Sequence, residues 1–157
     1  MADVCEVLKQ DHDDVGRMLA ELHIGPTALT GATGNQLAAR KRLTDQLIIA
    51  GARHEAVEAE FFWPVVRKQG PEADRLADQA VGQEQETRQA LASLDRLDAA
   101  ATEFEPLLTD VIAAGFEHIE FEEQLVWPLL RQAISLATAV KLGSEIAAGI
   151  RQPGVIC

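Results

Sequence analysis

One twenty-residue pattern occurs twice in the chain, and the second copy lies 64 positions after the first. Residues 48–67 and 112–131 share the string I-x-A-G-x-x-H-x-x-x-E-x-x-x-x-W-P-x-x-R. Each copy spaces its histidine and glutamate four residues apart, which puts both side chains on one face of a helix, about 6 Å apart along its axis. The repeat therefore predicts two helices that each carry an imidazole–carboxylate pair.

Apolar residues recur at helical spacing along most of the chain, which predicts five helices. The first begins after Asp3, a favourable N-cap residue, and stops at Gly25, while residues 27–35 are rich in turn formers and are predicted to form a loop. Thr102 opens a stretch with the form of a capping box, and Ser135 is suited to cap the last helix. The predicted helices cover about residues 4–24, 37–68, 71–97, 103–131 and 135–150.

Pro64 and Pro128 lie inside two of these helices, where each lacks a backbone donor and crowds the carbonyl four residues earlier, so both helices are predicted to kink. Four long helices with short connections favour an all-α, up-down-up-down four-helix bundle over about residues 3–131. The short fifth helix would cover the bundle end or mediate a dimer. A chain of 157 residues suits a single domain spanning residues 1–157.

Alternate helices of such a bundle run parallel and lie diagonally opposite, so His54 and Glu58 are predicted to face His118 and Glu122 across the core. Buried carboxylates without a counter-charge are costly, so something must compensate these side chains. Two cations about 3.5 to 4 Å apart would do so if each histidine binds one cation and the carboxylates bridge. The pattern predicts a dinuclear metal site.

Four side chains are too few for two metal ions, so the first and third helices should add ligands. The first helix offers His12. The third has no histidine, but overlaying residues 10–22 on residues 82–94 places Glu84 opposite His12. Glu84 is therefore the predicted sixth ligand, with Gln85 and Glu86 as alternatives.

The formal net charge of −11 makes nucleic acid and anionic membranes unfavourable partners. The two cysteines, Cys5 and Cys157, show no disulfide or zinc spacing, and we find neither a signal peptide nor a long apolar run. We expect a cytoplasmic protein, monomeric or homodimeric, whose partner is a small molecule.

These residues resemble the hemerythrin-like, or HHE cation-binding, family, and in particular its mycobacterial members. His12, the two HxxxE pairs and the Trp-Pro that follows each pair match the family pattern. The resemblance implies a four-helix bundle around two non-haem iron ions, bridged by oxo or hydroxo groups. Members are known for oxygen binding, oxygen or iron sensing, nitric oxide responses and peroxide chemistry. Manganese and zinc remain open, because they also suit nitrogen and oxygen ligands.

The sequence departs from the oxygen carriers of that family in two places. Carriers have HxxxH on the third helix, where this chain has Glu84 and Arg88, and HxxxxD on the fourth, where it has His118 and Glu122. Glu123 would keep the carriers' spacing and is the alternative to Glu122. Anionic carboxylates in place of imidazoles favour the ferric state and disfavour reversible oxygen release.

A carboxylate-rich di-iron site favours a catalase-like decomposition of hydrogen peroxide. The alternatives are non-catalytic binding or sensing of dioxygen, nitric oxide or iron, and a structural bundle in which the repeat is a relic. The absence of tyrosine argues against tyrosyl-radical chemistry. Four apolar residues near the pairs either line a dry ligand pocket or simply pack the core: Phe61, Phe62, Phe121 and Leu125.

Overall fold

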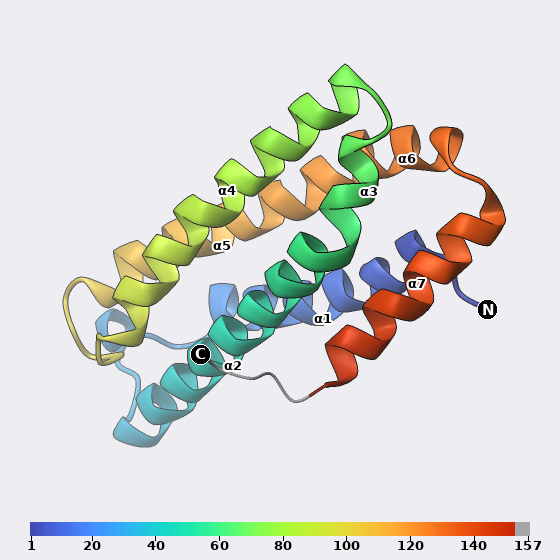
Figure 1. Ribbon diagram of the computed structural model, residues 1–157. Helices are drawn as coiled ribbons and strands as arrows, with labels where there is room; N and C mark the ends of the chain where they lie inside the picture. The colour runs from blue at the N-terminus through green and yellow to red at the C-terminus, as the bar shows by residue number, and fades with distance from the viewer. Residues whose placement is uncertain (153–157) are drawn as a thin grey trace.

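The computed structural model describes residues 1–152. Within this range the chain forms helices and no strands (Figure 1). The helices are α1 (Val4–Ile24), α2 (Gly34–Val57), α3 (Trp63–Arg67), α4 (Pro71–Asp95), α5 (Phe104–Phe121), α6 (Trp127–Ala133) and α7 (Leu136–Arg151). A short 3₁₀ turn, Ala28–Thr30, lies in the predicted loop. Because α2 continues into α3 and α5 into α6, residues 1–152 contain five continuous helices, as predicted.

The first four of these helices form the predicted bundle. Helix α1 packs beside α2 and α5, and α4 packs beside α5 and α2, so α1 lies diagonally opposite α4 and α2 opposite α5. This arrangement brings the two copies of the repeated pattern to opposite sides of one core. Among the described residues, no helix is both long and apolar enough to cross a membrane.

Two of the three predicted helix caps are correct. The Asp3 side chain accepts a hydrogen bond from the Glu6 backbone N–H, and the Glu6 carboxylate accepts one from the Asp3 backbone N–H, which completes a capping box. Ser135 accepts from the Thr138 backbone N–H. The capping box predicted at Thr102 is wrong, because α5 begins at Phe104 and no side chain caps it. A local sequence match cannot show at which residue the preceding turn ends and the helix begins.

A π-helical turn joins α2 to α3, and another joins α5 to α6. The turns span Glu58–Phe62 and Glu122–Val126, each ending directly before a Trp-Pro pair. The Trp63 backbone N–H donates to the carbonyl five residues earlier, and Trp127 does the same. The disturbance predicted at Pro64 and Pro128 therefore takes the form of a wider helical turn, a feature common at functional sites.

The interior contains two apolar clusters with a polar layer between them. Every helix of the four-helix bundle passes from one cluster to the other. On α1, for example, Leu8 belongs to one cluster and Leu19 to the other. The buried Asp11 and His12 lie between them in the chain. His54 on α2 and Glu84 on α4 lie between the two clusters in the same way. The buried Glu58 and Glu122 directly follow Val57 and Phe121, which belong to the cluster that contains Leu8.

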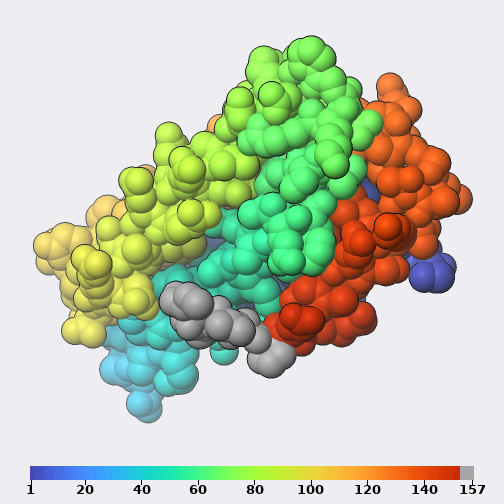
Figure 2. All heavy atoms as spheres, in the orientation of Figure 1, coloured from blue at the N-terminus to red at the C-terminus, as the bar shows by residue number. Residues whose placement is uncertain are grey.

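Helix α7 lies along the side of the bundle rather than over its end, and the alternative role in a dimer stays a prediction. It packs along α1 and also contacts α2 and the π turn before α3. Figure 2 shows α7 (red) against the α2–α3 helix (cyan to green). Gly143 permits the close approach, since a Cβ there would lie 2.8 Å from the Ala2 carbonyl oxygen. Cys5 is buried in the cluster beneath α7, and Cys157 lies outside the described residues.

Candidate metal centre

The structure brings the six predicted ligands together in the polar layer. They form two groups of four, and within each group one potential ligand atom per residue lies within 4.8 Å of the others. The first group is His12, His54, Glu58 and Glu122; the second is Glu58, Glu84, His118 and Glu122. Glu58 and Glu122 belong to both groups. The alternatives on α4, Gln85 and Glu86, are exposed and lie outside both groups.

The Nε2 atoms of the three histidines face the shared carboxylates. His54 Nε2 lies 3.4 Å from a Glu58 oxygen, and His12 Nε2 lies 3.4 Å from a Glu122 oxygen. His118 Nε2 lies 2.6 Å from the other Glu122 oxygen and 3.6 Å from Glu84. The four-residue spacing within each pair and the diagonal placement of α2 and α5 produce this convergence.

Several of these buried atoms have no hydrogen-bond partner. They include the Nε2 atoms of His12 and His118 and both carboxylate oxygens of Glu58 and of Glu122. His118 Nε2 and the nearer Glu122 oxygen, 2.6 Å apart, form an ion pair when the imidazole is protonated. Orphaned buried polar atoms are costly, and metal ions would satisfy them. Three imidazoles and three carboxylates form a nitrogen and oxygen donor set that fits iron, manganese or zinc.

Burial and neighbouring charges shift the pKa values of Glu58 and Glu122 in opposite directions. Burial raises the pKa of Glu58 well above its usual range, and the Glu122 and Glu84 carboxylates raise it further. Burial also opposes ionisation of Glu122, but the neighbouring His118 and His12 imidazoles outweigh it and hold the pKa of Glu122 well below its usual range. Burial disfavours charge on His118, yet Glu122 and Glu84 raise its pKa to about 10. Without metal, a proton on His118 compensates the carboxylates, and metal binding must release it.

Each histidine is supported at its second ring nitrogen. The Nδ1 atoms hydrogen-bond as follows: His54 to Asp11 at 2.6 Å, His12 to Glu123 at 3.0 Å and His118 to Gln83 at 2.8 Å. Because a carboxylate only accepts, Nδ1 of His54 and His12 carries the proton and Nε2 is left free to bind a metal. Glu123 therefore supports His12 from outside both groups, whereas Glu122 lies within them.

The two Trp-Pro motifs also reach the cluster, which the sequence reading did not anticipate. The Trp63 indole N–H donates to a Glu84 oxygen at 3.2 Å. The Trp127 ring stacks on His12 with centroids 5.0 Å apart. Each tryptophan follows a predicted ligand at a fixed distance in the sequence, which is a signal that it lies near the cluster. That spacing does not show which helix the tryptophan contacts.

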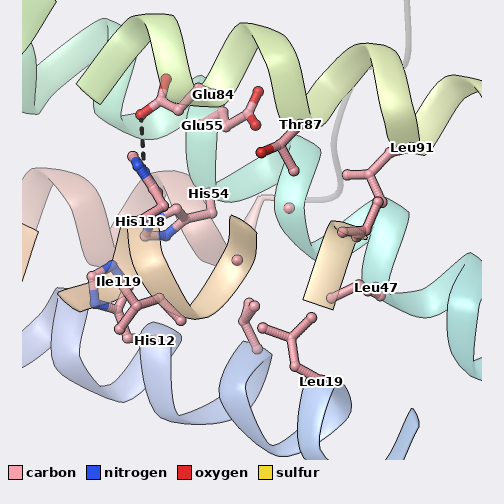
Figure 3. A pocket seen from close by; sticks show the side chains of 14 residues that line it. His12, Leu19, Leu47, His54, Glu55, Glu84, Thr87, Leu91, His118 and Ile119 are labelled. Carbon is pink, nitrogen blue, oxygen red and sulfur yellow. Dashed lines mark ion pairs between the residues drawn. The ribbon is translucent and has the colours of Figure 1, made fainter. Parts of the chain in front are cut away.

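A cavity of about 70 Å³ adjoins the cluster (Figure 3). His12, His54, His118 and Glu84 line one side, and Leu19, Leu47 and Leu91 form an apolar side. Val111 also lines the cavity. Gly51 and Gly115 also line it, one helical turn before the histidines of the repeat. Glu55 contributes a carboxylate, which the exposed Arg88 binds at 2.7 Å.

Of the two alternatives for the apolar residues near the pairs, core packing is confirmed for the phenylalanines, and the cavity lies elsewhere. Phe62 and Phe121 are buried in the apolar cluster on the other side of the polar layer, and Phe61 packs against that cluster. Leu125 is half exposed. Large side chains fill the space after the histidines. The absence of a side chain at Gly51 leaves space before His54, whereas Leu19 packs closely against Gly115.

Comparison with known proteins agrees with the fold and the cluster. The model of the hemerythrin HHE cation-binding domain family matches residues 3–130. A solved structure of a hemerythrin HHE cation-binding domain-containing protein from Mycobacterium kansasii is similar, with a TM-score of 0.78 and 21% identity. The match covers 97% of this chain and 87% of the other. None of the curated proteins matches the chain. The extent of the family match shows that this chain belongs to the hemerythrin HHE cation-binding family.

Proposed function

We propose that this protein holds two iron ions and decomposes hydrogen peroxide in a catalase-like reaction. The observation that carries the proposal is the buried cluster of two overlapping donor groups that opens on a small, largely apolar cavity. Three of its six side chains are carboxylates, and two of these belong to both groups. Such a shell favours higher metal charge states over reversible release of a neutral ligand.

The reaction balances without an outside reductant. One hydrogen peroxide takes up two electrons and two protons and becomes two water molecules, while a second gives up two electrons and two protons and becomes dioxygen. Two iron ions, when bound by the six predicted ligands, would supply the two-electron exchange between the two half-reactions. The net proton demand is zero, so the site needs only to keep protons close while one substrate replaces the other.

The chain's own residues would position and select the substrate. A cavity of about 70 Å³ has room for a few water-sized molecules and excludes most organic substrates. Its leucine and valine side keeps bulk water away from the cluster, while the histidines and Glu84 on the opposite side supply the polar contacts. Glu58 and Glu122 would hold the two metal ions at a fixed separation, because each carboxylate belongs to both groups.

The test is oxygen evolution from hydrogen peroxide by iron-loaded protein, measured with an oxygen electrode against an equal concentration of free iron. His54→Ala removes a predicted ligand and should abolish the activity above background. His23→Ala is the matched control, because His23 is exposed at the end of α1 and far from the cluster in sequence. Activity no higher than that of free iron, or equal activity in both variants, would refute the proposal.

Measurements on the same purified protein distinguish the alternative functions. An oxygenated absorption spectrum that reverses under vacuum, without oxygen evolution, would favour binding or sensing of a diatomic ligand. Metal analysis of the purified protein distinguishes iron from manganese and zinc. Less than one metal per chain, with no change of melting temperature on adding iron, would favour a purely structural bundle.

A further inference from the structure

The two halves of the bundle support their histidines with residues of different charge. Offsets of 72 and 64 residues relate α1 to α4 and α2 to α5, so that Asp11 corresponds to Gln83 and His54 to His118. In each half, the residue just before a predicted ligand on one helix hydrogen-bonds the histidine of the next helix. Asp11 accepts from His54 in the first half, and Gln83 binds His118 in the second.

This correspondence makes the support of His54 anionic and that of His118 neutral. Asp11 is buried, with 8% of its surface exposed, and its oxygen lies 2.6 Å from His54 Nδ1. Gln83 makes an equivalent contact at 2.8 Å with an uncharged amide. A carboxylate on the far nitrogen of an imidazole increases its basicity toward a metal, whereas an amide mainly fixes its orientation.

The remaining supports increase the asymmetry. His12, the other histidine of the first group, rests on the Glu123 carboxylate. Its counterpart Glu84 in the second group receives the neutral Trp63 indole N–H. Both imidazoles of the first group are therefore backed by carboxylates. The second group has its extra negative charge on the predicted ligand itself.

We propose that Asp11 and Gln83 are paired positioning residues whose difference in charge makes the two metal positions unequal. This inference rests on the proposed two-metal centre. Asp11 increases the metal affinity of the position that contains His54, because its negative charge lies on the far nitrogen of that imidazole. Gln83 orients His118 without adding charge. Two ions bound to one chain would consequently differ in affinity beyond the difference that His12 and Glu84 make as ligands.

Substitution at position 11 separates charge from orientation. Asp11→Asn keeps an oxygen that accepts from His54 Nδ1 and removes the charge, which reproduces the support that Gln83 gives His118. Asp11→Ala removes both. Gln83→Glu adds the missing charge to the second half. The melting temperature of each metal-free variant verifies that the fold is retained.

The measurement is titration of metal-free protein with Co²⁺, followed by visible absorption and by competition with a chelator. We expect Asp11→Asn to weaken one of two binding steps by about 10- to 100-fold and to leave the other within a few-fold of wild type. Gln83→Glu should strengthen the other step. Two binding steps that are unchanged in Asp11→Asn but weakened in Asp11→Ala would overturn the proposal, because they would show that only the hydrogen bond matters.

Failure of this inference is distinct from failure of the proposed function. Protein that binds two Co²⁺ ions with the expected response to Asp11→Asn, but evolves no oxygen when loaded with iron, would refute catalase-like activity alone. Wild-type protein that binds no Co²⁺ would overturn the inference together with the metal centre.

Discussion

Replacing Gly51 with alanine tests whether the cavity beside the cluster is the path of the substrate. Gly51 lies inside α2 and lines the cavity, one turn before His54. A Cβ at this position would lie 3.8 Å from Leu91 Cδ1, an ordinary van der Waals contact. The added methyl group therefore fits without displacing a neighbour and projects into the cavity. The six predicted ligands are unchanged.

The same substitution should stabilise the fold. Alanine is favoured over glycine in a helix interior by about 1 kcal/mol. For a chain of this size, about 1 kcal/mol corresponds to a rise in melting temperature of roughly 2 to 4 °C. Gly82→Ala is the matched control, because Gly82 lies inside α4, a Cβ there would meet nothing within 4 Å, and the residue does not line the cavity.

The two variants should gain similar stability and differ in peroxide turnover. Gly51→Ala should lower kcat/KM for hydrogen peroxide, and the larger Gly51→Leu should lower it further, by about tenfold for each 1.4 kcal/mol added to the entry barrier. Metal content should equal that of wild type in all three variants. Thermal denaturation, metal analysis and steady-state oxygen evolution give the three readouts. Wild-type kcat/KM in Gly51→Leu would show that substrate does not pass through this cavity.

Three further predictions concern the cluster and α7. Glu122→Gln should reduce bound metal below two ions per chain, because Glu122 belongs to both groups; the exposed Glu120→Gln serves as control, and elemental analysis gives the count. The pKa of His118 is raised to about 10 from an unfolded value of 6.5, so its contribution to the stability of metal-free protein is complete below pH 6.5 and should be lost as the pH rises toward 10. Urea denaturation measures the free energy of unfolding across this range. The reasoning would be contradicted if this free energy depended on pH equally in His118→Gln and wild type. Gly143→Ala should destabilise the protein by about 1 to 3 kcal/mol, since the new Cβ would lie 2.8 Å from the backbone of Ala2 and Asp3. Backbone atoms cannot move aside as the end of a flexible side chain can. An unchanged melting temperature would show that α7 is not held this closely.

The sequence by itself determined the helices and the residues of the cluster. Helical periodicity and the residues at Asp3 and Ser135 are local signals, and the structure places helix starts where they predict. The pairs His54–Glu58 and His118–Glu122 are equally local, because a helix fixes where i and i+4 lie. Even Glu84, chosen by a weak overlay of α4 on α1, lies in the cluster, because the two halves of the bundle repeat the same geometry.

Other features depended on how the helices rotate and pack against one another, and only the tertiary structure decided them. Asp11 and Glu123 support histidines on helices other than their own, and nothing in their local sequence shows which helix they would meet. The cavity lies on the glycine side of the cluster because the phenylalanines after each histidine fill the opposite side. Helix α7 lies along α1 because Gly143 lets the two backbones approach. Spacing along one helix fixes a face, whereas the distance between two faces depends on side chains that are remote in sequence.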